Sequence, residues 1–118
     1  MDRQFMKNKI FLVSHLFDDF SSSKVRPALC LTEPIGPHKH VVLAFITSRI
    51  PQQLLLTDLI LEASREEFST TGLRVSSTLQ LHRLMTVTTS MLRRELGTLP
   101  PSMQTQVSKR LLHLFDLE

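Results

Sequence analysis

Short apolar stretches recur along most of the chain, and polar or turn-forming residues separate them. Each stretch is too short for a typical helix, and several contain the β-branched residues that favour an extended backbone. Consecutive strands without long helical segments between them favour an antiparallel sheet over alternating β-α-β units. The predicted strands are 10–13, 28–31, 41–46, 76–81 and 84–88.

Three further segments before the last twenty residues have patterns of their own. Leu54–Leu61 is apolar with Thr57 and Asp58 inserted; we expect a strand there, although a short leucine-rich run is also compatible with a helix. Ser64–Gly72 mixes charged and small residues and ends in glycine, which predicts a connecting loop or a single helical turn. The proline and glycine residues of Glu33–Pro37 predict a turn.

From Pro100 onward the apolar residues recur at helical spacing, while Gln106, Lys109 and Arg110 lie off that stripe. The apolar positions are Met103, Val107, Leu111, Leu114 and Phe115. Together, the strands and this helix predict an α+β, mainly β fold. We expect a compact, SH3-like, curved antiparallel barrel with short helices and a C-terminal amphipathic helix.

Length and composition indicate one folded domain that spans residues 1–118. Hydrophobic residues make up 42% of the 118 residues, and no polar linker divides the chain. Met1–Lys9 carries charges of both signs and lacks the apolar core of a signal peptide, and no later segment has the length of a membrane span. We therefore expect a cytoplasmic protein.

The charge balance permits a polyanionic partner without identifying one, because the formal net charge is +3 and the sequence pI is about 9.5. Cys30, the only cysteine, lies in an apolar run, so an intrachain disulfide is impossible and a core position is expected. His38 and His40 lack the further ligands that a zinc site requires. We predict no metal and no other cofactor.

Arg26 is the first candidate for chemistry. It stands directly before Pro27, which biases its backbone toward an extended conformation. A guanidinium is always charged and offers a planar fork of donors, so it can stabilise a pentacoordinate phosphate transition state; Lys24 could add a less directional charge. From this segment alone, an ion pair between Arg26 and Asp18 or Asp19 is an equally good explanation.

A second candidate group follows the predicted strand 41–46. Thr47 and Ser48 present hydroxyls that can donate to a phosphate or orient a ribose hydroxyl, and Arg49 adjoins them. A Thr-Ser-Arg sequence after a strand is also ordinary loop chemistry. These residues indicate a phosphate-binding site only in combination with Arg26.

The two groups together resemble the paired motifs of the MazF/PemK family of toxins. The first is residues 24–29 (Lys-Val-Arg-Pro-Ala-Leu), and the second, at the right distance, is residues 46–48 (Ile-Thr-Ser). A third similarity follows in residues 81–87 (Leu-His-Arg-Leu-Met-Thr-Val) and 94–99 (Arg-Glu-Leu-Gly-Thr-Leu). The resemblance covers nearly the whole chain, roughly 9–117.

This resemblance implies a compact curved β-barrel with helices, a homodimer, a cognate antitoxin with an acidic, flexible segment, and cleavage of single-stranded RNA without a metal. The implied chemistry is attack of a ribose 2′-hydroxyl on the neighbouring phosphate, which leaves a 2′,3′-cyclic phosphate and a free 5′-hydroxyl. Arg26 matches the family's arginine at the scissile phosphate. Thr47 matches its hydroxyl residue at the strand end.

The sequence departs from the family pattern where a proton-transfer residue is expected. His82 stands where many members carry an aspartate, and Met85 stands where they carry an arginine. An unperturbed histidine has a pKa of about 6.5 and could act as base or acid. The alternative is a partly buried histidine that is hydrogen-bonded to the sheet.

The candidate residues therefore fall into two sets. The predicted catalytic residues are Arg26, Thr47 and His82, and the predicted RNA-binding residues are Lys24, Ser48, Arg49 and Arg83. A basic series in the C-terminal half could follow an RNA backbone or simply be a solvated face; it comprises Arg74, Arg83, Arg93 and Arg94. Two alternatives to a nuclease stay open: a non-enzymatic, CcdB-type module that binds another protein, and a structural dimer whose basic surface only binds RNA.

Overall fold

The computed structural model describes residues 5–14 and 25–118, whose strands form a six-stranded antiparallel sheet in the order β4-β5-β3-β2-β1-β6. The strands are β1 (Lys9–Ser14), β2 (Val25–Cys30), β3 (His40–Thr47), β4 (Asp58–Leu61), β5 (Ser77–Thr88) and β6 (Leu92–Thr98). Two short 3-10 helices, η1 (Glu66–Thr71) and η2 (Thr89–Met91), and the helix α1 (Pro101–Leu114) complete the described elements. The predicted mainly β, antiparallel fold is confirmed.

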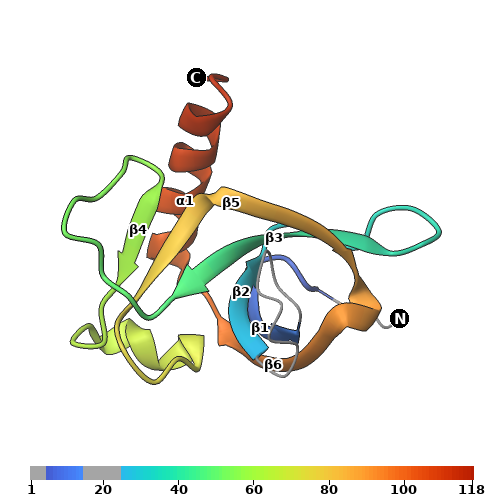
Figure 1. The fold of residues 1–118 in the computed structure, drawn as a ribbon, viewed down its shortest axis with the longest axis horizontal. Coiled ribbons are helices and arrows are strands. Elements are labelled where there is room, and N and C mark those ends of the chain that lie inside the picture. The colour runs from blue at the N-terminus through green and yellow to red at the C-terminus, as the bar shows by residue number, and fades with distance from the viewer. Residues whose placement is uncertain (1–4, 15–24) are drawn as a thin grey trace.

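The sheet is strongly curved but not closed. Figure 1 shows β3, β2, β1 and β6 curling round, with the second half of β5 completing the curl, while β4 and α1 lie to one side. In the part of the chain that the structure describes, β4 and β6 form the two edges of the sheet and do not pair with each other. The predicted barrel is therefore an open, curled sheet.

Two apolar clusters lie on the two faces of this sheet, because successive side chains of a strand point to opposite faces. Ile10 of β1 pairs with Leu29 of β2, and both belong to the cluster that also contains Val107 of α1. The next pair along the strands, Phe11 and Ala28, belongs to the second cluster. Neighbouring residues of a strand therefore pack into different apolar clusters, one on each face of the sheet.

Helix α1 confirms the predicted amphipathic helix. Val107 is buried, Met103 and Leu111 pack against the same cluster, and Phe115 is 55% exposed just beyond the helix end. Pro101 occupies the first turn, where its missing N–H costs no hydrogen bond. Within residues 5–14 and 25–118, no helix is long and apolar enough to cross a membrane.

The strand predicted over Leu54–Leu61 is wrong in its first half, because only Asp58–Leu61 is extended. A turn occupies the preceding residues: the Asp58 carboxylate accepts a hydrogen bond from the Leu55 N–H at 3.0 Å, and the Asp58 N–H donates to the Leu55 carbonyl at 3.0 Å. Leu56 is 67% exposed as a result. The apolar composition of Leu54–Leu56 predicts burial, but these three side chains are exposed.

The two strands predicted at 76–81 and 84–88 are one strand, β5, of twelve residues. Its pairing with β3 slips in the middle: Ala44 pairs with Leu84, whereas Phe45 pairs with Gln80. Residues 81–83 of β5 therefore bulge out of the β3 ladder. The polar His-Arg pair in this bulge interrupts the apolar pattern, which is why the sequence suggests two strands.

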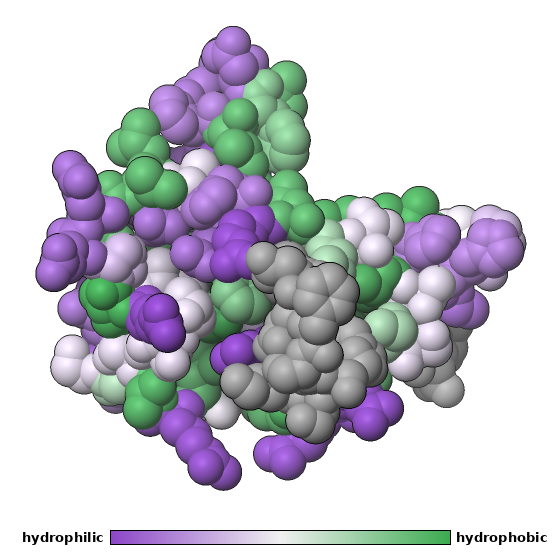
Figure 2. All heavy atoms as spheres, viewed as in Figure 1, coloured by the Kyte–Doolittle hydropathy of each residue, from purple (hydrophilic) through white to green (hydrophobic). Residues whose placement is uncertain are grey.

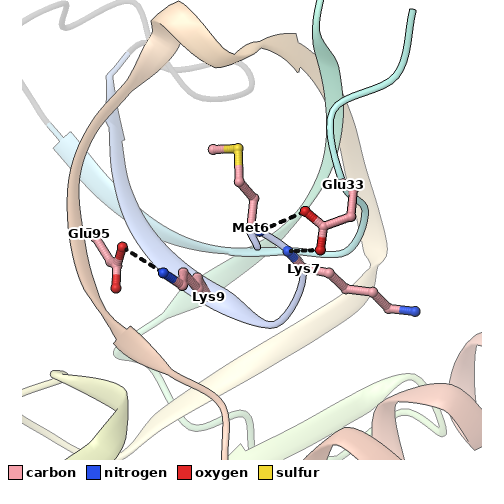
Figure 3. Close-up of polar contacts among 5 residues, drawn as sticks. All are labelled: Met6, Lys7, Lys9, Glu33 and Glu95. Carbon is pink, nitrogen blue, oxygen red and sulfur yellow. Dashed lines mark hydrogen bonds and ion pairs between the residues drawn. The ribbon is translucent and has the colours of Figure 1, made fainter. Parts of the chain in front are cut away.

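Strand β6 was not among the predicted strands. It is an edge strand whose charged residues Arg93, Arg94 and Glu95 are all exposed, so it lacks the apolar alternation that marks the other strands. Figure 3 shows one of its anchors, an ion pair between Glu95 Oε1 and Lys9 Nζ of β1 at 3.2 Å. The segment 64–72, predicted as a loop or helical turn, contains η1 as expected.

The segment before β1 is held against the loop that follows β2. The Glu33 carboxylate accepts hydrogen bonds from the backbone N–H groups of Met6 at 2.8 Å and Lys7 at 3.3 Å (Figure 3). Two backbone donors that precede the strand are thereby satisfied. These two hydrogen bonds therefore hold the residues that precede β1 against the loop that follows β2.

We expect Cys30 to resist alkylation by iodoacetamide in the folded protein. Its side chain is fully buried, and its Sγ donates to the Thr32 carbonyl at 3.2 Å. Burial raises the pKa of the Cys30 thiol, and the hydrogen bond to Thr32 opposes that shift only in part, so the reactive thiolate is scarce at neutral pH. Mass spectrometry after labelling tests this, with a urea-unfolded sample as control; equal labelling of both samples would contradict it.

Candidate active site

The ends of β2 and β3 bring the two predicted motifs together. Ala28 pairs with Phe45, and Cys30 pairs with Leu43, in the antiparallel register of these strands. Extended by two residues, the same register sets Arg26 opposite Thr47 on one face of the sheet. Two residues far apart in the sequence thus become cross-strand neighbours.

A cleft of about 330 Å³ opens at these strand ends. Three of the predicted residues, Arg26, Thr47 and Ser48, line it. Arg74 and Arg94 line it as well, from the segment after η1 and from β6. The remaining lining residues are mostly apolar: Leu12, Val25, Pro27, Ile46, Gly72, Leu73, Val75, Ser77 and Leu96.

The Thr47 hydroxyl is held in place by its own loop. Its Oγ1 accepts a hydrogen bond from the Arg49 N–H at 3.2 Å, which leaves the hydroxyl proton able to donate to a ligand. The buried Thr78 of β5 donates its hydroxyl to the Arg49 carbonyl at 2.8 Å and so fixes this turn to the sheet. Arg49 therefore positions Thr47 through its backbone.

Two glycines set the opposite wall of the cleft. A Cβ on Gly72 would lie 2.1 Å from the Leu96 carbonyl oxygen, and a Cβ on Gly97 would lie 2.2 Å from the Thr70 carbonyl oxygen. The backbone after η1 therefore packs directly on β6, which only glycine permits at both contacts. Gly72 also has a φ of +73°, which glycine adopts without strain.

Among the described lining residues, the charged groups are three arginines, and no carboxylate or histidine accompanies them. Guanidinium groups at the mouth of a cleft with apolar walls attract anions and hold phosphate oxygens by paired hydrogen bonds. The geometry suits binding and charge stabilisation of a phosphate. It does not supply a general base from the described lining.

Comparison with known proteins identifies the family of the chain. A family model described as PemK-like, MazF-like toxin of type II toxin-antitoxin system matches residues 9–115. The chain belongs to this family. Among curated proteins, no sequence matches the chain.

Solved structures of such toxins share the fold. The Mycobacterium tuberculosis toxin MazF-mt6 is 25% identical, with a TM-score of 0.70 over 93% of this chain and 98% of that chain. An Mtb toxin is 27% identical, with a TM-score of 0.60 over 75% of this chain and 90% of that chain. A mycobacterial endoribonuclease in complex with its cognate antitoxin is 14% identical, with a TM-score of 0.69 over 98% of each chain.

Three other predicted site residues of this MazF/PemK toxin, Arg49, His82 and Arg83, are not among the described residues that line the cleft. His82 is exposed in the β5 bulge, and its Nδ1 lies 3.0 Å from the Thr57 hydroxyl. The Arg83 guanidinium lies over the Phe45 ring, 4.4 Å from its centroid, in a cation–π contact. The structure therefore does not place His82 with Arg26 and Thr47, and its catalytic role stays a prediction without geometric support.

Lys24, together with Asp18 and Asp19, lies outside the described residues. Arg74 and Arg94 are the cleft residues that sequence reasoning did not select, although both belong to the noted basic series. Arg94 begins the segment 94–99 that resembles the family, whereas the position of Arg74 carries no local motif. Each arginine lies near a glycine, Gly72 or Gly97, whose packing role requires the tertiary structure.

Potential metal ligands do not cluster among the described residues. No group of three or more histidine, cysteine, aspartate or glutamate side chains there could hold a metal ion. His38 and His40 lie with ring centroids 5.9 Å apart, without a third such side chain among the described residues. The prediction of a metal-independent protein stays a prediction.

Proposed function

We propose that this toxin is an endoribonuclease that cleaves single-stranded RNA without a metal ion. The observation that supports the proposal is the shared cleft, in which Arg26 and Thr47 stand at neighbouring strand ends beside apolar walls. Membership of the MazF/PemK toxin family, whose members are known endoribonucleases, supports it independently. Toxicity would follow from RNA cleavage.

The reaction we propose begins with a ribose 2′-oxygen that attacks the adjacent phosphorus. The new bond joins that oxygen to phosphorus, and the bond from phosphorus to the 5′-oxygen breaks. Solvent water takes up the 2′-hydroxyl proton and supplies the proton that the leaving 5′-oxygen gains. Arg26 stabilises the extra negative charge of the pentacoordinate species through its paired donors. Thr47, with its hydroxyl proton available, donates to a nonbridging oxygen.

A test of this function is incubation of the purified toxin with single-stranded RNA in EDTA. We expect cleavage that leaves 2′,3′-cyclic phosphate and 5′-hydroxyl ends, detected by mass spectrometry of the fragments. The same oligonucleotide made of DNA should stay intact because it lacks the nucleophile. Intact RNA in EDTA together with cleavage in magnesium would overturn metal independence, and intact RNA in both would overturn the nuclease.

A second candidate function is that of a non-enzymatic, CcdB-type module that binds another protein. The observation that favours it is the cleft lining, in which no described residue is a histidine or carboxylate able to take the 2′-hydroxyl proton. In that case the cleft would bind an acidic protein segment. Failure to cleave RNA, combined with toxicity in cells that Arg26→Ala abolishes, would support this alternative.

We further propose a cognate antitoxin and a homodimer as partners, and a cytoplasmic location. The antitoxin is supported by the mycobacterial endoribonuclease of the same fold, which was solved with its own antitoxin. The homodimer is supported by exposed apolar side chains near the end of α1, where Leu112, Phe115 and Leu117 are 44%, 55% and 69% exposed. Figure 2 shows this hydrophobic surface on the projecting C-terminal helix.

A further inference from the structure

We propose that Arg74 and Arg94 bind the phosphates that flank the scissile phosphate, so that the cleft accepts three consecutive phosphodiesters of single-stranded RNA. The inference rests on the proposed nuclease function, because it takes Arg26 as the residue at the scissile phosphate. It assigns a substrate-binding role to two residues of the opposite wall. It also predicts that the toxin cleaves within a strand and not at its ends.

The charge of the cleft supports a run of phosphates. Each phosphodiester carries one negative charge, whereas the described lining carries three guanidinium groups and no carboxylate. The acidic neighbour of Arg94, Glu95, does not line this cleft and is engaged by Lys9 at 3.2 Å (Figure 3). A single bound phosphate would leave the lining with an excess of positive charge.

Arg74 and Arg94 are also available to a ligand. Both are exposed, and neither forms an ion pair with any residue between 5 and 14 or between 25 and 118. In contrast, Arg65 is held by Glu67 at 2.8 Å, and Arg110 donates to the Leu56 carbonyl at 2.8 Å. A guanidinium that is not engaged within the protein keeps its whole fork of donors for phosphate oxygens.

The two arginines stand on backbone that is fixed in position. Gly72 packs on the Leu96 carbonyl and Gly97 on the Thr70 carbonyl, so the segment that carries Arg74 cannot shift independently of β6. The Thr70 hydroxyl adds a hydrogen bond to the Thr98 carbonyl at 3.1 Å. Binding groups on rigid, mutually packed elements hold their spacing, which a row of phosphates requires.

Apolar side chains line the same cleft as the arginines. Leu12, Leu73 and Leu96 line it beside Arg74 and Arg94. Single-stranded RNA exposes base and ribose faces that pack on apolar and aromatic surfaces, whereas these faces are stacked inside a duplex. The combination of charged rim and apolar wall therefore favours a single strand over a duplex.

The test measures binding of an RNA analogue that cannot react. A fluorescent oligonucleotide with 2′-O-methyl groups lacks the nucleophile, so fluorescence anisotropy at several salt concentrations reports binding alone. We expect Arg74→Gln and Arg94→Gln each to weaken binding about tenfold and to reduce the slope of log K against log salt by about 0.7. Affinity should rise with oligonucleotide length up to three phosphates and then level off.

Arg93→Gln is the matched control, because Arg93 does not line the cleft that holds Arg26, whereas Arg94 lines both that cleft and a second one that it shares with Arg93. It removes the same charge and should change the slope much less. Equal effects of Arg93→Gln and Arg94→Gln would overturn the inference, since net charge alone would then explain binding. Thermal melts of each variant check folding.

The two proposals fail in different ways. If unmodified RNA is cleaved but Arg74→Gln and Arg94→Gln bind the analogue like wild type, the flanking-phosphate assignment is wrong and the nuclease stands. If RNA stays intact, the nuclease is wrong. Analogue binding that still depends on Arg74 and Arg94 would then show a phosphate-binding cleft without catalysis.

Discussion

Arg26→Ala is expected to lower the rate of RNA cleavage by about a hundredfold to a thousandfold, the typical cost of removing one preorganised group that stabilises transition-state charge. Arg26 is only partly buried at a strand end, so the free energy of unfolding should change by about 1 kcal/mol or less. Single-turnover cleavage at saturating toxin separates the chemical step from binding. A variant that keeps more than a tenth of the wild-type rate would remove Arg26 from the proposed mechanism.

Three further variants extend this experiment. Arg26→Lys keeps the charge but loses the planar fork of donors. Compared with Arg26→Ala, it should therefore restore RNA binding more than the rate of RNA cleavage. Arg65→Ala removes an arginine that is paired with Glu67 outside the cleft and serves as the control for net charge. His82→Ala tests the role of His82 in proton transfer. Because His82 is not among the described residues that line the cleft, we expect a nearly normal rate, and a large loss would restore the sequence-based assignment.

Gly97→Ala is expected to destabilise the toxin by about 3 kcal/mol or more, because the new methyl group meets backbone and not a flexible side chain. The Cβ would lie 2.2 Å from the Thr70 carbonyl oxygen and 2.6 Å from the Thr71 carbonyl carbon. Relief requires separation of η1 from β6, which also moves the wall that carries Arg74. Urea unfolding monitored by circular dichroism measures the loss of stability.

Gly36→Ala is the matched control for this prediction. Its φ of +72° makes alanine unfavourable there, but apart from its chain neighbours no described residue has an atom within 4 Å of the new Cβ. We expect a loss of about 1 kcal/mol from backbone conformation alone. If both variants lose the same stability, steric contact at Gly97 is not what holds η1 against β6.

Much of the fold could be predicted because strands and helices have local patterns. Runs such as 10–13 and 41–46 have the length and β-branched content of buried strands, and Val107 sits at the centre of a helical stripe. Prediction of the strands failed where the backbone conformation depends on polar side chains and not on an apolar pattern. The turn that ends at Asp58 depends on a side-chain hydrogen bond, and β6 is an exposed edge without apolar alternation.

The candidate site likewise contains residues that the sequence could predict and one that it could not place. Arg26, Thr47 and Ser48 could be selected from the sequence because each lies in a motif that resembles a known family, and the β2–β3 register brings them together. His82 could not be placed, because the bulge in β5 decides which face its side chain occupies. A shift of one residue in strand register reverses the face, and no local pattern fixes that shift.

By itself, the sequence determined the mainly β fold, the C-terminal helix, the family motifs and the pairing of Arg26 with Thr47 as candidate chemistry. Only the tertiary structure decided that Arg74 and Arg94 share their cleft and that His82 does not line it. The physical reason is that periodicity and motifs act over neighbouring residues, whereas the cleft wall exists through contacts between Gly72 and β6, which are distant in the chain. Such contacts form only when the sheet has curled.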